Sequence, residues 1–456
     1  MTAILLCLLL LFPAAGFSAG RQIAFGRFGE VTVYRPQKIE HTAIFISGDG
    51  GWNLGVVDMA VELEKMNTLV IGVNITAYLK VLRAAKGDCS YPAADLEELS
   101  QFVQKDLGLA AYIRPVLVGY SSGATLVYAA LAQAPPNTFK GALSMGFCPD
   151  LAINKPLCKG RGLEQDPLLK GKGFTFRPTS ALEEPWIAFQ GLADKVCDAT
   201  AVENFVKNVK GGDIVHLPKV GHGFGVTRNW LPQFQAAFSR LSEEKLEPAI
   251  PEQVNDLPLV ELPVKDSTKD YLAVIVSGDG GWASIDRELA SVLVRDGVPV
   301  VGLNSLKYFW TKRSPESSAA DLGRIMKYYL AAWGKKKAVL VGYSRGADVL
   351  PFMANRLPAE LKDKVALLAL LAPGQKTEFE MHMTDWLGGG GSGLPIKPEV
   401  ENWKNSRILC FYGRSDKGDL CRTLAPERFT LVPLGGGHHF GGAYKEIAGR
   451  ILEEAR

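Results

Sequence analysis

Short apolar runs alternate with longer amphipathic stretches along most of the chain. Runs such as 42–46, 69–73 and 115–118 contain almost only apolar residues, which is the pattern of strands buried on both faces of a parallel sheet. Between such runs lie stretches with helical periodicity, for example 93–104 and 319–329. Buried strands that alternate with helices predict an α/β fold with a doubly wound, mostly parallel sheet.

The same series of motifs occurs twice, in the same order. The matching pairs are FISGDGGW (45–52) and IVSGDGGW (275–282), VIGVN (70–74) and VVGLN (300–304), AADL (93–96 and 319–322), GYSSG (119–123) and GYSRG (342–346), and GHGFG (221–225) and GHHFG (437–441). Each copy has the size of a whole domain and is too long for a solenoid repeat. We therefore expect two tandem domains of one fold, at 22–242 and 265–456.

Residues 243–264 separate the two copies. This stretch is rich in Pro, Glu, Asp and Lys and has no helical periodicity, which predicts an extended linker. Apolar residues alternate near 257–264, so this part could instead form the first strand of the second domain.

The amino terminus begins with an apolar run at 4–15, followed by small residues up to Gly20. Such a run is too short to span a bilayer, which takes about 20 residues, and is typical of a secretory signal peptide. We expect a cleaved signal at 1–19 and an exported protein. Because no Lys or Arg precedes the apolar run, an uncleaved anchor is the alternative.

The charge and the cysteines narrow the range of functions. A net charge of +3 without a basic stripe gives no indication of nucleic-acid binding.

Once Cys7 is removed, an even number of cysteines remains, which in an exported protein predicts disulfides. The second copy holds only Cys410 and Cys421, so these two would pair, whereas the first copy allows three pairings. No CxxC or HExxH spacing occurs, so neither a metal site nor another cofactor is predicted.

The motif at 342–346 has the context of a nucleophile elbow. It follows an apolar strand at 338–341 and precedes an apolar helix, and a turn this tight needs small residues on both sides of the serine. Ser344 is thus the predicted nucleophile of the second copy, and Ser121 holds the same position in the first. We therefore expect two tandem α/β-hydrolase-type domains.

The acid and the base of such a site should follow the serine in that order. Asp416 comes directly after an apolar strand at 407–412, and Asp194 is its equivalent in the first copy. Asp419 and Asp198 are nearby alternatives.

The histidine is expected last, near the end of each domain. His438 aligns with His222 of the first copy and is preferred over its neighbour His439. The predicted triad is Ser344, Asp416 and His438, and a second one is formed by Ser121, Asp194 and His222. In such a triad the imidazole takes the proton of the serine, which attacks an ester carbonyl.

Backbone N–H groups should stabilise the oxyanion that this attack creates. One donor is expected from the residue after the serine, Arg345, or Ser122 in the first copy. The other should come from the glycine-rich loop after an early strand, where Asp279, Gly280 and Gly281 lie. The Lys and Ser/Thr of a nucleotide-binding loop are missing from this segment.

The duplicated SGDGGW, the GYSxG motif and the closing GHHF resemble the AcvB/VirJ family of bacterial virulence proteins, in its two-domain form, over nearly the whole mature chain. The resemblance implies a periplasmic hydrolase that releases lysine from lysyl-phosphatidylglycerol. It also implies that the C-terminal domain carries the activity, with Ser344, Asp416 and His438 as its triad. The expected partners are an aminoacylated phospholipid at the membrane surface and proteins of the secretion system or the envelope.

A cationic lysyl ester would need a carboxylate near the serine. The candidates are Asp279, Asp321, Asp348 and Asp385. Access to a lipid could involve the insert 375–403, which holds Phe379, Met381, Met383, Trp386 and the glycine-rich stretch 388–393; a membrane-facing lid and an ordinary flexible loop are equally compatible with it.

Two other functions remain open at this point. One is a different exported carboxylesterase or lipase. The other is a non-catalytic accessory protein that binds a partner in secretion or virulence, a role that the first copy alone could also have.

Overall fold

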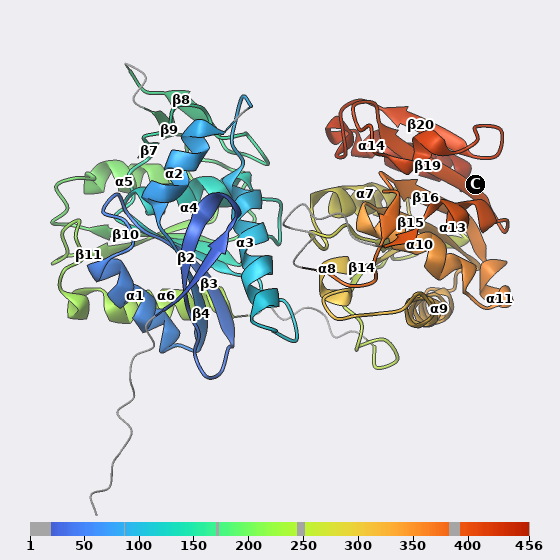
Figure 1. The fold of residues 1–456 in the computed structure, drawn as a ribbon, viewed down its shortest axis with the longest axis horizontal. Helices are drawn as coiled ribbons and strands as arrows, with labels where there is room; N and C mark the ends of the chain where they lie inside the picture. Colours follow the sequence, from blue (N-terminus) through green and yellow to red (C-terminus); the bar gives the residue numbers. More distant parts are fainter. Residues whose placement is uncertain (1–19, 86, 170–172, 244–250, 383–392, 456) are drawn as a thin grey trace, which may run out of the picture.

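A computed structural model describes residues 20–85, 87–169, 173–243, 251–382 and 393–455. The signal peptide expected at 1–19 lies outside these residues. The chain forms two large sheets, one in each copy of the repeat (Figure 1). Among the described residues, no helix combines the length and the apolar character needed to cross a bilayer.

The two large sheets have the same central topology. Their strand orders are β1-β2-β4-β3-β5-β6-β10-β11 and β12-β14-β13-β15-β16-β19-β20. Neighbouring strands are parallel except at one edge, where β1 and β2 in the first sheet and β12 in the second pair antiparallel. The strands of the first sheet are β1 (Arg21–Phe25), β2 (Gly29–Tyr34), β3 (His41–Ile46), β4 (Thr68–Val73), β5 (Val116–Tyr120), β6 (Gly141–Met145), β10 (Trp186–Gly191) and β11 (Gly212–Leu217). Those of the second are β12 (Leu259–Leu262), β13 (Tyr271–Val276), β14 (Val300–Leu303), β15 (Lys337–Tyr343), β16 (Val365–Leu371), β19 (Arg407–Gly413) and β20 (Thr430–Leu434).

Helices cover both faces of each sheet. The helices of the first domain are α1 (Leu54–Glu64), α2 (Ile75–Ala84), α3 (Pro92–Asp106), α4 (Ser122–Gln133), α5 (Ala199–Lys207) and α6 (Leu231–Ser242). Those of the second are α7 (Ser284–Arg295), α8 (Ser305–Tyr308), α9 (Pro315–Ala332), α10 (Arg345–Asn355), α11 (Ala359–Lys362), α13 (Lys397–Asn402) and α14 (Tyr444–Glu454). In the first domain α1 and α6 share one apolar core with the sheet, while α2 to α5 share another. In the second, α7 and α14 cover one face and α9 and α10 the other. The expected doubly wound α/β-hydrolase fold is thus confirmed in both copies.

The stretch between the copies, 243–264, is not a linker throughout. Leu259–Leu262 form β12, which pairs antiparallel with β14 at the edge of the second sheet. Just before it, Val254 and Leu257 are buried. The alternation of apolar residues in this part therefore marks a strand, and the second domain begins before residue 265.

The insert after β16 is partly built into the second domain. A short hairpin pairs β17 (Lys376–Thr377) with β18 (Leu394–Pro395), and Phe379 and Met381 are buried in the core with α9 and α10. These two side chains therefore do not face a membrane. Met383, Trp386 and residues 388–392 lie outside the described residues.

The two domains contact each other along α3 (Figure 1). Lys105 of α3 donates to the backbone oxygen of Trp310 and pairs with Glu380, at 3.1 Å. The indole N–H of Trp310 in turn donates to the carbonyl of Leu109 at 2.7 Å. Tyr112 packs into the apolar core of the second domain. This contact brings the end of α3 close to the loops that follow β13 and β14.

Three disulfides join the six cysteines of the described chain. They link Cys89 to Cys158, Cys148 to Cys197, and Cys410 to Cys421. The last pair is the one expected for the second copy. Cys197 and Cys421 both lie a few residues after the aspartates expected to serve as catalytic acids, so two of the bridges fix these loops.

Candidate active sites

The predicted nucleophiles lie at sharp turns between a strand and a helix. Ser344 joins β15 to α10 with a φ of 50°, and Ser121 joins β5 to α4 with a φ of 56°. A residue with a side chain is rarely found in this left-handed region, where it costs about 1–3 kcal/mol. The turn places each hydroxyl at the carboxyl edge of its sheet, as a nucleophile elbow requires.

The glycines of the motif are required by close backbone contacts. A Cβ atom on Gly346 would lie 1.9 Å from the carbonyl oxygen of Val276, and one on Gly342 would lie 2.4 Å from that of Gly346. Only glycine lets α10 pack this closely against β13 and β15. The flanking residues of the motif therefore hold the serine turn in place.

Replacement of Gly346 by alanine is expected to destabilise the protein by about 1–3 kcal/mol, because the added methyl group meets backbone that cannot move aside. The measurement is thermal unfolding followed by circular dichroism. Gly449→Ala is the matched control, since no atom lies within 4 Å of a Cβ added inside α14; it should stabilise slightly, by about 0.5–1 kcal/mol. Equal melting temperatures for the two variants would contradict the steric explanation.

In the second domain the three residues predicted as a triad lie within hydrogen-bonding distance of one another. His438 Nε2 is 2.9 Å from Ser344 Oγ, and His438 Nδ1 is 3.2 Å from Asp416 Oδ2. Asp416 follows β19 and His438 follows β20, so both come from the carboxyl edge. The side chains of His438 and Asp416 are 43% and 23% exposed, so the site opens directly to solvent.

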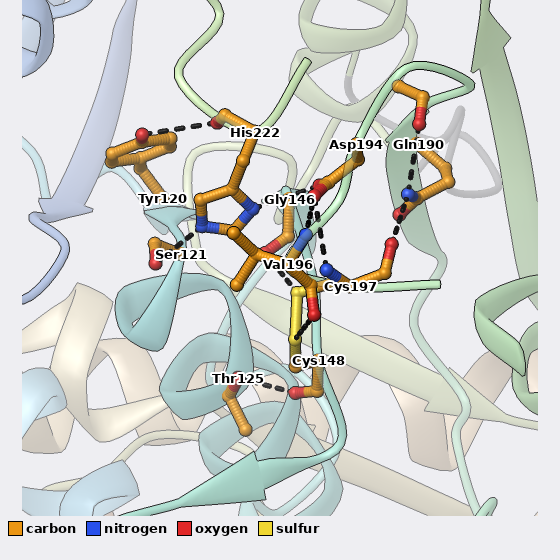
Figure 2. Close-up of a disulfide and its surroundings, with 11 residues drawn as sticks. Tyr120, Ser121, Thr125, Gly146, Cys148, Gln190, Asp194, Val196, Cys197 and His222 are labelled. Atoms are coloured by element: carbon orange, nitrogen blue, oxygen red, sulfur yellow. Dashed lines mark hydrogen bonds and ion pairs between the residues drawn. A yellow bond between two sulfur atoms is a disulfide. The ribbon is translucent and has the colours of Figure 1, made fainter. Parts of the chain in front are cut away.

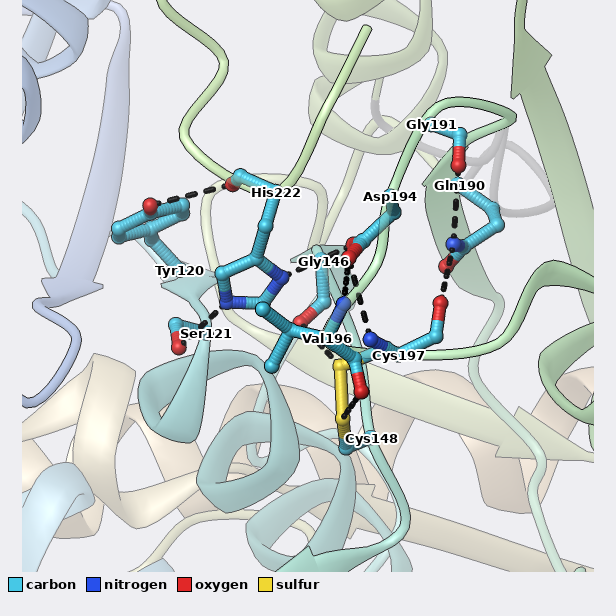
Figure 3. A network of polar contacts seen from close by, with 10 residues as sticks. All are labelled: Tyr120, Ser121, Gly146, Cys148, Gln190, Gly191, Asp194, Val196, Cys197 and His222. Atoms are coloured by element: carbon cyan, nitrogen blue, oxygen red, sulfur yellow. Dashed lines mark hydrogen bonds and ion pairs between the residues drawn. A yellow bond between two sulfur atoms is a disulfide. The ribbon is translucent and has the colours of Figure 1, made fainter.

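The first domain brings its own three residues together in the same way (Figure 3). His222 Nε2 is 3.0 Å from Ser121 Oγ, and its Nδ1 is 2.9 Å from Asp194 Oδ2. Asp194 also accepts hydrogen bonds from the backbone N–H groups of Val196 and Cys197, at 2.8 and 3.1 Å. Each copy of the repeat therefore holds a complete Ser–His–Asp arrangement.

The alternative acids have structural roles. Asp198 accepts from the N–H of Ala201 and caps α5. Asp419 accepts from the N–H of Cys421 at 2.8 Å, and burial raises its pKa to about 7. Neither carboxylate is the one bonded to a triad histidine.

The alternative base, His439, bonds to Tyr343 instead of Ser344. The Tyr343 hydroxyl lies 2.7 Å from His439 Nδ1. Burial and the neighbouring His438 lower the pKa of His439, which favours the neutral ring and allows it to accept a hydrogen bond from the Tyr343 hydroxyl. His438 is thus the histidine that the fold brings to the serine.

The glycine-rich loop lies beside the nucleophile. The two glycines expected to donate to the oxyanion, however, use their N–H groups in other hydrogen bonds. The N–H of Gly280 donates to Asp279 Oδ1 at 3.0 Å, and that of Gly281 donates to Gly278 O at 3.1 Å. A Cβ atom on Gly278 would lie 3.6 Å from the Cβ of Ser344. The N–H groups of Gly280 and Gly281 are thus used within the loop, and the backbone near Gly278 is what faces the serine. The oxyanion role expected of Gly280 and Gly281 stays a prediction.

The residue after each serine makes the main difference between the two sites. In the first domain the Ser122 hydroxyl donates to Asp49 Oδ1 at 2.8 Å. In the second domain Arg345 sits at the start of α10, where its N–H has the expected place for an oxyanion donor. Its side chain points to the insert, where it donates to the carbonyls of Glu378 and Glu380. Asp279, the equivalent of Asp49, is exposed and forms no ion pair with another residue of the described chain.

Of the other carboxylates considered for a cationic substrate, most have structural roles. Asp321 bonds to the Tyr308 hydroxyl and pairs with Arg324. Asp348 accepts from the N–H of Gly374 at 2.6 Å, and burial raises its pKa to about 7. Asp385 lies outside the described residues. Among the candidates in the described part of the chain, Asp279 is the one that remains.

One carboxylate near the second site was missed by the sequence analysis. Glu97, on α3 of the first domain, extends to within 3.9 Å of where a Cβ on Gly280 would lie. Burial and the negative charge of Asp279 raise its pKa to about 8. No local pattern in the sequence marks Glu97, because it reaches the second site only through the contact between the domains.

Glu97 lines a cavity of about 230 Å³ between the two domains. The cavity borders the loops after β13 and β14, at the carboxyl edge of the second sheet. Its other lining residues include Tyr112, Arg114, Gly280, Trp282, Asn304 and Lys307. The cavity thus holds both an acidic group and basic groups next to the glycine-rich loop.

Asp194, Cys197 and His222 have potential ligand atoms within 4.8 Å of one another. Cys197 Sγ, however, is bonded to Cys148, and a disulfide sulfur lacks the thiolate that binds zinc. With the bridge formed, this group is better explained by the triad geometry.

Three solved structures illustrate what the chain is similar to. One is an α/β serine hydrolase without a lid from Xanthomonas campestris, 20% identical, which matches over 53% of this chain and 99% of its own with a TM-score of 0.33. The others are Est1E from Butyrivibrio proteoclasticus (13% identical, 49% and 99% covered, TM-score 0.32) and an esterase domain of a Rhodothermus marinus protein (15%, 46% and 92%, TM-score 0.32). No curated protein sequence matches.

The family comparison agrees with the resemblance seen in the motifs. The model of the bacterial virulence protein VirJ matches residues 40–147 and 270–456. These two regions include both glycine-rich loops and both serine turns, and the second includes the whole Ser344 triad. The chain therefore belongs to the VirJ family of bacterial virulence proteins.

Proposed function

We propose that the C-terminal domain is a periplasmic serine hydrolase that cleaves the aminoacyl ester of lysyl-phosphatidylglycerol. The observation that carries the proposal is the contact of His438 with both Ser344 and Asp416, at 2.9 and 3.2 Å. A scaffold that only binds a partner has no chemical need for a serine, a base and an acid in this arrangement.

The reaction follows from the positions of these groups. His438 Nε2 takes the proton of Ser344 while Oγ attacks the carbonyl carbon of the lysyl ester, and the oxyanion is stabilised by the N–H of Arg345. The C–O bond to the glycerol then breaks, and His438 returns its proton to the leaving oxygen, which releases phosphatidylglycerol. Water, deprotonated by the same imidazole, hydrolyses the lysyl-enzyme, so that free lysine leaves and Ser344 regains its proton.

The charges around the site suit a cationic acyl group. Asp279 is exposed beside Ser344, and Glu97 extends from the first domain toward the same loop. An ammonium group between them would favour the ionised form of Glu97 and pair with both carboxylates. Arg114 and Lys307 of the same cavity could hold a phosphate.

The direct test is lysine release from vesicles that contain lysyl-phosphatidylglycerol, with alanyl-phosphatidylglycerol and a neutral p-nitrophenyl ester as comparison substrates. We expect the lysyl lipid to have the highest kcat/KM. A preference for the neutral ester would favour the alternative of a general exported carboxylesterase, and the absence of any hydrolysis would favour an accessory binding protein.

Glu97→Gln is expected to raise KM for the lysyl lipid roughly tenfold, with a smaller change in kcat, because it removes a charge that binds the ground state and the transition state alike. In the wild type, Glu97 is protonated below its pKa of about 8 and must ionise to bind a cation. KM should therefore fall as the pH rises from about 6.5 to 8.5.

The control for this effect is Glu98→Gln, which changes an exposed neighbour on the same helix. Asp279, Arg114 and Lys307 also face this region and are unchanged in both variants. Burial and the charge of Asp95 raise the pKa of Glu98 as well, so the pH dependence of KM is measured for both variants. If the KM of the Glu97→Gln variant depended on pH in the same way as the KM of the wild type, Glu97 would not bind the substrate.

A further inference from the structure

The N-terminal triad is better shielded than the one in the C-terminal domain. The side chains of His222 and Asp194 are 19% and 0% exposed, compared with 43% and 23% for His438 and Asp416. Hydrogen bonds between a buried carboxylate and an imidazole are stronger where water is excluded. By geometry alone, the first domain therefore has the better-formed catalytic group.

We propose that the N-terminal domain is a second active serine hydrolase site, with Ser121 as its nucleophile, and that it takes an uncharged ester with a small apolar acyl group. This site goes beyond the function proposed for the C-terminal domain and does not depend on it.

The loop that carries the acid is anchored at several points (Figure 2). The Cys148–Cys197 bridge joins it to the segment after β6, and the side-chain amide of Gln190 donates to the carbonyl of Cys197 at 3.0 Å. Two N–H groups of the loop point at Asp194 itself. The carboxylate is thus preorganised to orient the imidazole, as a working triad requires.

Close contacts also hold the ring of His222. Gly146 lies under its ring with a φ of +65°, and a Cβ atom there would lie 3.2 Å from His222 Cε1. The Tyr120 hydroxyl donates to the backbone carbonyl of His222 at 3.1 Å (Figure 3). Together with the strained φ of Ser121, these contacts hold all three groups in the geometry of proton transfer.

The surroundings of Ser121 differ in charge from those of Ser344. Glu97 adds a second carboxylate beside the glycine-rich loop of the C-terminal site, whereas no described atom lies within 4 Å of a Cβ built on the equivalent Gly50. The loops that carry Asp194 and His222 expose apolar side chains: Leu192 is 51%, Val196 68% and Val226 49% exposed. Exposed apolar side chains on the loops of a shielded triad favour an uncharged acyl group.

A cavity of about 190 Å³ lies beside this triad. It is lined by the glycine-rich loop, by Val56 and Met59 of α1, and by Tyr120 and Gly223, the neighbours of the serine and the histidine. This volume suits a short acyl chain. In the reaction, His222 takes the Ser121 proton, Oγ bonds to the acyl carbon, the alcohol leaves with that proton, and water then frees the acid.

The test begins with a fluorophosphonate probe, which reacts only with activated serines. The full mature chain is labelled as wild type, Ser344→Ala, Ser121→Ala and the double variant, and the labelled peptides are identified by mass spectrometry. We expect Ser344→Ala to be labelled at Ser121 and the double variant to be unlabelled. A Ser344→Ala protein that melts like the wild type but carries no label on Ser121 would overturn the proposal.

The substrate class is tested in the Ser344→Ala background, with p-nitrophenyl butyrate and the p-nitrophenyl ester of lysine. We expect the Ser344→Ala protein to hydrolyse the butyrate ester, with or without EDTA. The additional Ser121→Ala change should lower this rate at least about 100-fold. Faster cleavage of the lysine ester would overturn the uncharged-substrate assignment. Because Ser344 is absent, these results do not depend on whether the C-terminal domain acts on lysyl lipids.

Discussion

Replacing Ser344 with alanine is expected to lower kcat/KM for lysine release from lysyl-phosphatidylglycerol by about 10⁴-fold or more. The serine supplies the oxygen that forms the acyl-enzyme, and loss of the nucleophile removes the whole triad pathway, because the three groups act as a unit. The residual rate would come from substrate binding and the oxyanion donors alone. The measurement is the rate at which free lysine is released from vesicles, at saturating and at subsaturating substrate concentrations.

Ser121→Ala is the matched control for this variant. It makes the same change at the equivalent turn, where Ser121 has a φ of 56° compared with 50° for Ser344. Lysine release should stay close to the wild-type rate. If Ser121→Ala abolished it while Ser344→Ala did not, the lysyl-lipid activity would belong to the N-terminal domain.

The sequence predicted those parts of the site that depend on local turns and chain order. Ser344, Asp416 and His438 each follow a buried strand, and parallel strands bring their carboxyl ends to one edge of the sheet. The fold class, the repeat and the position of each serine turn could be inferred in this way. The internal duplication was essential, because it distinguished His438 from its neighbour His439 by alignment with His222.

The features that the sequence did not reveal depend on contacts between distant segments. Glu97 reaches the Gly280 loop only because α3 packs against the second domain through Lys105 and Trp310. Likewise, the bond between Asp49 and Ser122 depends on how two loops meet. The hydrogen bonds of the Gly280 and Gly281 N–H groups within their own loop could not be predicted either, because a glycine-rich loop can satisfy its own N–H groups and no residue spacing shows this.

The two proposals together imply that one fold serves different substrates through few changes near the nucleophile. Asp49 and Asp279 each accept a hydrogen bond from a neutral donor, the Ser122 hydroxyl and the Gly280 N–H. Only the second loop has a further carboxylate beside it, that of Glu97, and such a carboxylate attracts a positively charged acyl group. Specificity would then be set by the contact between the domains, while the triad itself stays unchanged.

His438→Gln is expected to lower kcat for lysine release by about 10⁴-fold or more, because no base then remains to take the Ser344 proton. His439→Gln should cost about tenfold or less. His439 contacts the Tyr343 hydroxyl at 2.7 Å and thus supports the turn before Ser344 without touching the reacting groups. The measurement is kcat and KM for both variants, together with their melting temperatures.

The comparison of these two histidines separates proton transfer from support of the fold. Both lie in one loop, and a glutamine at either position keeps a hydrogen-bonding side chain of similar length. A large loss of kcat confined to His438→Gln would therefore reflect the missing base. If His439→Gln caused the larger loss of kcat without a lower melting temperature, His439 would be the catalytic base. The loop would then have to rearrange during catalysis to bring His439, and not His438, between Ser344 and Asp416.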